Sequence, residues 1–306
     1  MRKIALSLVA FAFVLAACSD KTTTGNGSPS TSSSASATVA ATAADCATGA
    51  TFLSSGNLTV GTSEPAYPPY FGGGTPKGSA WTINDPTTGK GFESAVAYEV
   101  AKRLGFTSSQ VTWAMVKFAQ SYAPGTKPFD FDINEISYKP ARAQAVDFSD
   151  SYYDLNQALV VVKGTPIASA TSIADLKPYT LAAPLGTTSY DLITNVIVPD
   201  KDPGVYQTEN DAVAAINAGQ VDGLVVDLPT ALYMTAVGQV KNSTVLGQFA
   251  NAAGATPEHF GMVFAKGSSL TPCVNLALAE MKADGTLQAI TKEWLSTKTN
   301  VPTFGP

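Results

Sequence analysis

Short apolar runs alternate with helical patterns along the chain after residue 50. The runs are five to seven residues long and rich in β-branched residues, which is typical of strands. Strands that alternate with helices favour an α/β fold with mainly parallel sheets. The predicted strands are 58–62, 110–116, 131–136, 157–163, 179–183, 223–227, 244–249 and 260–265.

The stretches between these runs carry the three- and four-residue spacing of amphipathic helices. The pattern over 94–104 places apolar residues on one stripe and ends at Gly105, a common C-terminal stop. Residues 67–91 have no periodicity and are rich in Pro, Gly and Thr, so they predict a long surface loop. The other predicted helices are 272–283, 287–296 and one that ends at Ala218 and is capped by Asn210 or Asp211.

The N-terminus has the pattern of an export signal. Arg2 and Lys3 precede an apolar run from Ile4 to Ala17, shorter than the roughly 20 residues that cross a membrane. The run ends in Leu-Ala-Ala-Cys18, which resembles the lipobox of bacterial lipoproteins. We therefore expect residues 1–18 to be a lipoprotein signal peptide, with Cys18 lipidated and the protein anchored to the outer face of the cell membrane. The alternative is a soluble secreted or periplasmic protein cut near Ala17.

A segment of low complexity follows the signal. From Ser19 to Asp45, 21 of 27 residues are Ser, Thr, Ala or Gly, so the segment buries too little apolar surface to offset the entropy of ordering. We expect a flexible tether over 19–50, with the folded part beginning near Cys46. Cys46 and Cys273 then form a disulfide in an oxidising compartment or remain two buried thiols.

Charge and composition restrict the function. Removal of the signal leaves 17 basic residues against 24 acidic ones, and no cluster of Lys and Arg is present, which argues against a nucleic-acid partner. The glycine motifs of hydrolases and nucleotide-binding proteins are missing. His259 is the only histidine, which excludes a multi-histidine metal site. We expect no metal and no cofactor, and a structural role for His259.

Four separated segments each supply a group that the backbone of a free amino acid requires. In order they are 58–71 with 91–93, 133–149, 185–189 and 221–229. The second begins Ile-Asn-Glu-Ile-Ser-Tyr-Lys-Pro-Ala-Arg and continues to Val-Asp-Phe-Ser. In this order the segments resemble the polar amino-acid-binding proteins of ABC importers, which have the periplasmic-binding-protein-like type II fold. The resemblance extends from residue 58 to residue 296.

The second segment carries the main predicted contact. The resemblance implies that Arg142 binds the ligand carboxylate, beside Ser137, and a guanidinium presents a planar fork that matches a carboxylate. The alternative is a surface arginine at the start of a helix. Glu135 stands where the family commonly has a small or amide residue; it either meets a cationic or amide ligand side chain or pairs with Lys139.

The third and fourth segments supply the opposite side of the ligand. Thr187 and Thr188 lie in a turn that opens a helix, and the resemblance implies that this turn binds the same carboxylate; alone, such a turn is more often a simple N-cap. Asp227 ends an apolar strand, and the resemblance implies that it pairs with the ligand ammonium. It is also placed to cap the helix that contains Pro229.

The first segment supplies the candidates for contact with the ligand side chain. The resemblance implies an aromatic side chain there, and Tyr67, Tyr70 and Phe71 are the matching residues. Their alternative is a packed aromatic loop. Together with Glu64 and Glu135, they favour a polar or basic ligand side chain.

The resemblance also implies the domain organisation and the mechanism. One lobe comprises 51–156 and 260–306, the other 157–259, and two strands near 157–162 and 259–264 join them. A bound amino acid closes this hinge, and the loaded monomer is recognised by a membrane permease. The rival function is an enzyme on the same fold, such as a lyase similar to cyclohexadienyl dehydratase, for which the sequence shows no obvious acid and base pair.

Overall fold

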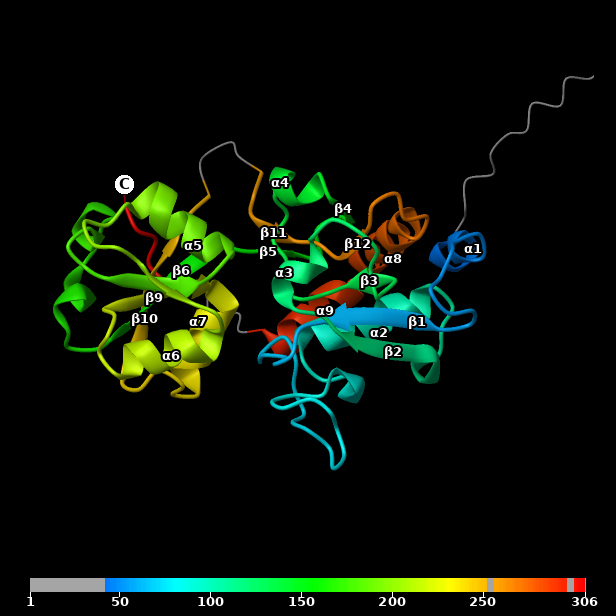
Figure 1. Ribbon diagram of the computed structural model, residues 1–306, viewed down its shortest axis with the longest axis horizontal. Helices are drawn as coiled ribbons and strands as arrows, with labels where there is room; N and C mark the ends of the chain where they lie inside the picture. Colours follow the sequence, from blue (N-terminus) through cyan, green and yellow to red (C-terminus); the bar gives the residue numbers. More distant parts are fainter. Residues whose placement is uncertain (1–41, 252–255, 296–299, 306) are drawn as a thin grey trace, which may run out of the picture. The chain divides into compact units, whose positions relative to one another are not determined.

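The computed structural model describes residues 42–251, 256–295 and 300–305 of the chain. The described residues all belong to one compact unit. The unit contains two five-stranded sheets and a two-stranded one, with helices packed against the larger sheets, which confirms the predicted α/β class (Figure 1). The predicted signal peptide, Cys18 and most of the predicted tether lie outside the described residues. Within the described ranges, none of the helices combines the length and apolar character that a membrane crossing requires.

The first sheet has the strand order β2-β1-β3-β12-β4. β1 pairs in parallel with β2 and β3, whereas β12 runs antiparallel to both of its neighbours. Helices pack on it through a core that includes Leu58, Val60 and Phe131. The strands are β1 (Leu58–Thr62), β2 (Val111–Met115), β3 (Phe131–Asp132), β4 (Val146–Phe148) and β12 (Val263–Ala265), and the helices of this core are α2 (Phe92–Arg103), α8 (Thr271–Ala283) and α9 (Thr286–Trp294).

The second sheet has the strand order β10-β6-β9-β7-β8. β7 is parallel to β8 and β9, whereas β6 is antiparallel to β9 and β10. The central strand β9 is apolar from Leu224 to Val226 and buried on both faces, each of which has its own core. The strands are β6 (Gln157–Val162), β7 (Leu181–Pro184), β8 (Gly204–Tyr206), β9 (Gly223–Asp227) and β10 (Ser243–Phe249).

Two short strands connect the sheets. β5 (Tyr153–Asp154) follows the first sheet and precedes β6, and β11 (His259–Phe260) lies on the return path before β12. They pair antiparallel, with His259 opposite Asp154. The sequence placed the joining strands at 157–162 and 259–264. The first position is wrong by a few residues, because 157–162 pairs on both sides inside the second sheet as β6.

The shorter helices occur where the chain leaves a strand. Thr208 caps α6 by accepting a hydrogen bond from the Asp211 backbone N–H, so the predicted cap at Asn210 or Asp211 is wrong and Glu209 enters the first turn. Residues 67–91 are irregular apart from the 3-10 turn η1 (Pro86–Thr88), as the sequence predicted. The remaining helices are α3 (Phe118–Ser121), α4 (Pro140–Ala143), α5 (Thr188–Leu192) with a π-helical turn (Ile193–Ile197), α6 (Glu209–Asn217) and α7 (Leu228–Ala236).

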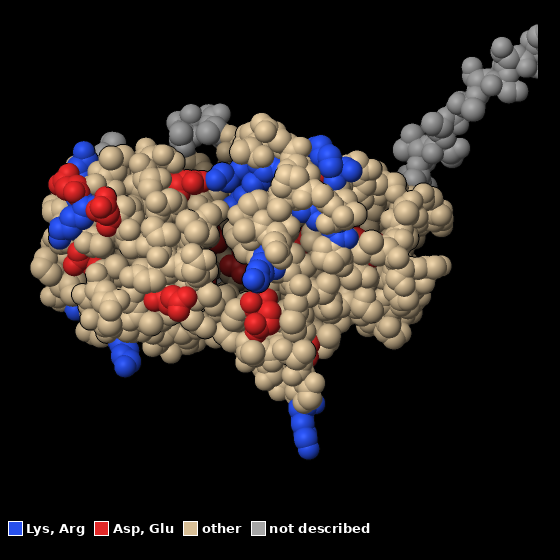
Figure 2. Space-filling model, in the orientation of Figure 1, with Lys and Arg blue, Asp and Glu red and all other residues tan. Residues whose placement is uncertain are grey.

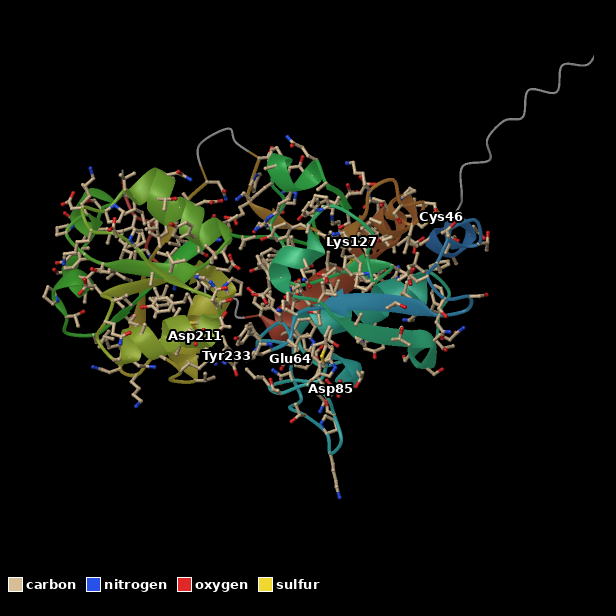
Figure 3. The ribbon with its side chains drawn as sticks, viewed as in Figure 1. Cys46, Glu64, Asp85, Lys127, Asp211 and Tyr233 are labelled. Atoms are coloured by element: carbon tan, nitrogen blue, oxygen red, sulfur yellow. A yellow bond between two sulfur atoms is a disulfide. The ribbon has the colours of Figure 1, made fainter. Side chains whose placement is uncertain are left out.

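The chain before β1 is attached to α8. Cys46, labelled in Figure 3, forms a disulfide with Cys273 at an S–S distance of 1.99 Å. Cys46 belongs to α1 (Ala43–Ala47), and the backbone N–H of Ala43 donates to Glu280 of α8. The expectation of a flexible tether up to residue 50 is therefore wrong for α1, because the covalent link and the buried Ala43 order this turn.

The last described residues lie along the second sheet. Gln248 of β10 pairs with Thr303, and Ser172 pairs with Gly305. Phe304 packs on Phe249, with ring centroids 4.9 Å apart. The sequence assigned residues 260–306 to the first lobe, whereas the hydrogen bonds of these final residues are to the second.

Candidate ligand-binding pocket

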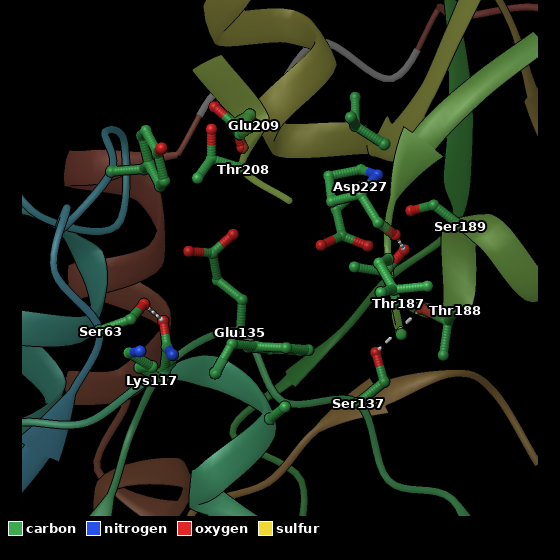
Figure 4. A pocket seen from close by; sticks show the side chains of 18 of the residues that line it. Ser63, Lys117, Glu135, Ser137, Thr187, Thr188, Ser189, Thr208, Glu209 and Asp227 are labelled. Atoms are coloured by element: carbon green, nitrogen blue, oxygen red, sulfur yellow. Dashed lines mark hydrogen bonds between the residues drawn. The ribbon is translucent and has the colours of Figure 1, made fainter. Parts of the chain in front are cut away.

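A cavity of about 550 Å³ lies where strands of both large sheets end (Figure 4). β1, β3, β7, β8 and β9 all have lining residues at or shortly after their carboxyl ends, the usual ligand position in open α/β sheets. Figure 2 shows acidic side chains deep in a hollow of the surface. Eight of the ten predicted ligand-binding residues line this cavity: Glu64, Tyr67, Glu135, Ser137, Arg142, Thr187, Thr188 and Asp227.

Arg142 is buried at the end of the pocket that faces α5. Pro140 starts α4 at the N1 position, and Arg142 follows in the same short helix with 6% of its surface exposed. Its guanidinium donates to the Ser137 carbonyl at 2.7 Å and to the Gly186 carbonyl at 2.9 Å, so it links the two sheets. It also stacks over the Tyr122 ring at 4.4 Å. Two of its five N–H donors contact these carbonyls, and the group is held in one orientation.

The turn after β7 faces Arg142 from the second sheet. The Thr187 hydroxyl caps α5 by accepting from the Tyr190 N–H and donates to the Pro184 carbonyl. The Thr188 hydroxyl lies 3.4 Å from the Ser137 hydroxyl of the first sheet. Thr187 is therefore occupied by local structure, whereas Thr188 meets Ser137 across the pocket.

Asp227 lies at the carboxyl end of β9 and precedes α7. It occupies the N-cap position, yet within the described part of the chain its side chain makes no capping hydrogen bond. Its Oδ1 instead accepts from Gln157 Nε2 at 2.5 Å. Burial, together with the nearby charge of Glu258, raises the pKa of Asp227 well above its usual range. A cation beside Asp227 would favour its ionised form.

The other end of the pocket holds two more carboxylates that face each other across the sheets. Figure 4 shows the Glu135 carboxylate directed towards Thr208 and Glu209, which begin α6. Burial raises the pKa of Glu209 to about 8. Burial and then the charges of Glu93, Glu209 and Asp227 raise the pKa of Glu135. The predicted alternative of a Glu135–Lys139 pair is wrong, because Lys139 pairs with Asp191 of α5.

Two predicted aromatic contacts lie in the core rather than in the pocket. Phe71 is 1% exposed and packs edge-on against Trp113 of β2. Tyr70 is fully buried, and its hydroxyl accepts from the pocket residue Thr230 at 3.2 Å. Tyr70 therefore supports the wall of the pocket from behind, whereas Phe71 belongs to the core of the first sheet. His259, predicted to be structural, stacks on Tyr138 with ring centroids 5.4 Å apart.

Several residues around the pocket escaped the sequence reasoning. Glu209 and Lys117 line it, and Gln157 lies behind Asp227. Glu209 follows the short strand β8, which no apolar run predicted, and the misplaced helix cap hid its position. Among the described residues, no three His, Cys, Asp or Glu side chains are grouped so as to hold a metal ion.

Comparisons with known proteins agree on one family. The sequence pattern of the bacterial extracellular solute-binding proteins, family 3, matches residues 58–297. The L-cystine-binding protein TcyA of Bacillus subtilis is 32% identical over 80% of this chain and 83% of its own. The glutamine-binding protein GlnH of the same organism is 28% identical over 70% of this chain and 76% of its own.

Solved structures agree with the sequence relatives. An ancestral arginine-binding protein bound to arginine has a TM-score of 0.64 and 28% identity, and the match covers 79% of this chain and 99% of that one. An ancestral amino acid-binding protein described as a precursor of cyclohexadienyl dehydratase has a TM-score of 0.63 and 28% identity, with 79% of this chain and 96% of that one covered.

Proposed function

Since the chain belongs to the bacterial extracellular solute-binding proteins, family 3, we propose that it binds a free amino acid with a basic side chain and delivers it to the membrane permease of an ABC importer. The ligand lies in the cavity between the two sheets and contacts both. Contacts with both sheets exist only when the hinge is closed, so binding shifts the population to the closed form. The permease then distinguishes loaded from empty monomers.

The carboxylate of the ligand binds at the Arg142 end. Arg142 is buried, oriented by the Ser137 and Gly186 carbonyls, and flanked by the hydroxyls of Ser137 and Thr188. A guanidinium with remaining N–H donors, next to two hydroxyls, matches the acceptor set of a carboxylate. This arrangement supports the role that the sequence predicted for Arg142, Ser137 and Thr188.

The ammonium of the ligand binds at Asp227. Gln157 holds one oxygen of this carboxylate by a hydrogen bond. The burial and nearby acids that raise its pKa make the ionised form costly without a cation, so an ammonium is favoured there. The two poles of an amino acid are thereby bound by one residue from each large sheet region, Arg142 and Asp227.

The observation that supports a basic side chain on the ligand is the charge of the residues that line the cavity. Four acidic residues line the cavity against two basic ones, Lys117 and Arg142. A zwitterion engages Arg142 and Asp227 and leaves the remaining acids in excess. A second positive charge on the ligand balances them, next to Glu135 and Glu209. An ancestral arginine-binding protein with the same fold is bound to arginine in one solved structure and to glutamine in another, so a related pocket holds amino acids with long polar side chains.

The experiment is titration calorimetry of the full chain with arginine, lysine, citrulline and glutamine. Citrulline has nearly the shape of arginine without its charge, so the pair isolates the second cation. We expect arginine or lysine to bind at least roughly tenfold more tightly than citrulline, as charge-assisted hydrogen bonds require. Equal binding of arginine and citrulline would contradict the basic ligand, and no binding of any common amino acid would contradict the function.

We also propose that this protein is a binder rather than a lyase. Incubation with prephenate or arogenate should leave both compounds unchanged, as followed by chromatography. The reason for the assay is the ancestral dehydratase precursor among the structural neighbours. Turnover that disappears on replacing a pocket acid would overturn the proposal.

The family and the sequence support a proposal for how the protein is attached to the membrane. The family is extracellular, and we propose that the cysteine of the Leu-Ala-Ala-Cys18 motif carries the lipid that anchors the protein outside the cell membrane. Cells grown with labelled palmitate should incorporate label into the protein, and a Cys18→Ala variant should not. Equal labelling of both would exclude Cys18 as the lipidated residue.

A further inference from the structure

The Glu135 backbone adopts a conformation that its neighbours must hold in place. Its φ is 53°, in the left-handed region that residues other than glycine seldom occupy. Such a conformation is energetically unfavourable and persists only where surrounding contacts impose it. This turn directs the Glu135 side chain into the cavity from a chain that has just left β3.

A single buried carboxylate contacts that turn. Glu93 is fully buried in the first turn of α2, and its Oε1 accepts from the Glu135 backbone N–H at 2.6 Å. The same oxygen accepts from the Tyr152 hydroxyl. Glu93 Oε2 is buried and has no hydrogen-bond partner among the described residues. One oxygen therefore connects α2, the residue before β5 and the turn that carries Glu135.

The start of α2 is itself fixed. Gly91 has a φ of 94°, and a Cβ built there would lie 2.4 Å from the Tyr70 carbonyl oxygen, so only glycine allows this close approach. The same carbonyl accepts from the Glu93 backbone N–H at 2.9 Å. Tyr152 is 2% exposed and packs between Phe92 and Phe260. The backbone of Glu93 and the Tyr152 side chain that donates to its carboxylate are therefore both fixed. The Glu93 carboxylate can thus hold the Glu135 turn in one conformation.

We propose that Glu93, which does not line the pocket, is the positioning residue that holds the Glu135 carboxylate towards the ligand and thereby sets the selectivity for a cationic side chain. The inference rests on the proposed function, because it requires Glu135 to face the ligand. Glu93 acts through the Glu135 backbone by its hydrogen bond and through the Glu135 carboxylate by its charge.

The charge of Glu93 reaches Glu135 together with other groups. Glu209 of α6 and Asp227 of β9 also raise the pKa of Glu135, while Lys117 and Arg142 line the same cavity. Burial raises the pKa of Tyr70 and Tyr152, and the charge of Glu135 adds to this at Tyr70 and that of Glu93 at Tyr152, so both stay neutral. Binding of a cation requires ionised Glu135. Affinity for arginine therefore rises with pH through the raised pKa of Glu135 and then levels off.

Two substitutions separate the geometric from the electrostatic part. Glu93→Gln keeps an oxygen that accepts both hydrogen bonds but removes the negative charge. We expect it to keep the arginine-to-citrulline affinity ratio at pH 8 within about threefold and to move the rise of arginine affinity to lower pH. Glu93→Ala removes the acceptor and should lower that ratio roughly tenfold, the scale of a charge-assisted hydrogen bond. Both are measured by calorimetry between pH 5 and pH 9.

Three further variants keep the test falsifiable. Tyr152→Phe retains Glu93 but removes one of its two donors, and should lower the ratio about threefold even if Glu93→Ala fails to fold. Glu135→Gln should lower the ratio at least as much as Glu93→Ala. Glu293→Gln, on the exposed face of α9, is the matched control and should change neither the ratio nor the pH profile.

The outcomes distinguish this inference from the function on which it rests. Glu93→Ala and Tyr152→Phe that lower the melting temperature but weaken arginine and citrulline equally would show that Glu93 is merely structural and overturn the inference. An unchanged pH profile in Glu93→Gln would overturn its electrostatic part. If Glu135→Gln itself leaves the ratio unchanged, the proposed role of Glu135 fails first.

Discussion

The two ends of the pocket differ in the contacts that their polar groups make. At the Arg142 end, polar groups already contact one another: Arg142 with Gly186 and Ser137 with Thr188 across the sheets, and Gln157 with Asp227 within the second sheet. At the other end, Glu135 and Glu209 face the cavity from opposite sides, and their pKa values are raised by burial.

The Arg142 end therefore faces groups that every amino acid has, whereas the Glu135 end faces a group that only basic amino acids have. The Arg142 end is a hydrogen-bonded network in which Arg142 keeps further N–H donors that any α-carboxylate can accept from. The Glu135 end places like charges together, and only a proton or a ligand cation relieves their repulsion. We therefore expect substitutions at the first end to affect every ligand equally, and substitutions at the second end to change the selectivity.

The largest expected effect is at the shared end. Arg142→Met should weaken arginine, lysine and citrulline alike by at least roughly 100-fold, because a buried charged hydrogen-bond partner contributes about 2–5 kcal/mol. Calorimetry measures the loss. Arg103→Met is the matched control, since Arg103 pairs with Glu99 and Asp284 away from the pocket. Loss of arginine binding alone would show that Arg142 does not bind the common carboxylate.

A smaller and selective effect is expected at the opposite end. Glu209→Gln should weaken arginine about three- to tenfold and leave citrulline within about twofold, because Glu135 still supplies one carboxylate for the cation. The measurement is the ratio of the two dissociation constants at pH 8. An equal loss for both ligands would place Glu209 with the shared contacts and remove the distinction between the two ends.

The ligand-free protein should lose stability as the pH rises. Glu93 and Glu209 have pKa values raised to about 7 and about 8 by burial, above the value of about 4.3 for an unfolded glutamate. Between these values the folded state binds more protons than the unfolded state, so the free energy of unfolding falls with increasing pH. We expect the melting temperature to fall by a few degrees from pH 5 to pH 8.5, and saturating arginine to flatten the curve.

The contrary result is also informative. A melting temperature that rises over this range would mean that the pocket acids are ionised without cost. Glu209→Gln should shallow the slope, whereas Glu293→Gln, on an exposed surface, should not.

The smallest effect concerns a contact outside both ends. Lys139 pairs with Asp191 across the sheets, and both side chains are partly exposed, so the pair contributes at most about 1 kcal/mol. Lys139→Ala should speed the dissociation of arginine and citrulline equally, by no more than about fivefold, as measured by stopped-flow fluorescence. A Lys139→Asp, Asp191→Lys double variant should restore the rate. Unequal effects on the two ligands would show that this pair also contributes to the selectivity between them.

The sequence predicted the elements whose bounds are defined by local signals. β1 and β9 were predicted with the observed bounds, because apolar residues bounded by glycine and polar residues define both. The predicted strand 260–265 is interrupted instead: His259–Phe260 pairs in the hinge and Val263–Ala265 in the first sheet. The apolar run is continuous, but its partners belong to two sheets, and no local signal shows that change.

The same limit applies to the pocket. Arg142 and Asp227 stand in recognisable segments, and both line the cavity. Glu93 was visible beside Gly91 but received no role, because its function depends on a contact 42 residues away with Glu135. Phe71 was wrongly expected at the ligand. The sequence does not distinguish an aromatic residue of a loop that faces a cavity from one that packs in the core, as Phe71 does against Trp113.

The last residues of the chain have a mechanical consequence. α9 packs in the core of the first sheet, whereas residues 300–305 lie beside the second sheet, where Phe304 packs against Phe249 and Gly247. Only a few residues separate Leu295 from Val301, and a fully extended chain spans at most about 3.6 Å per residue. Because these few residues join α9 covalently to the segment beside β10, we expect them to limit how far the two large sheets can separate when the hinge opens, so that a solute enters through a restricted opening.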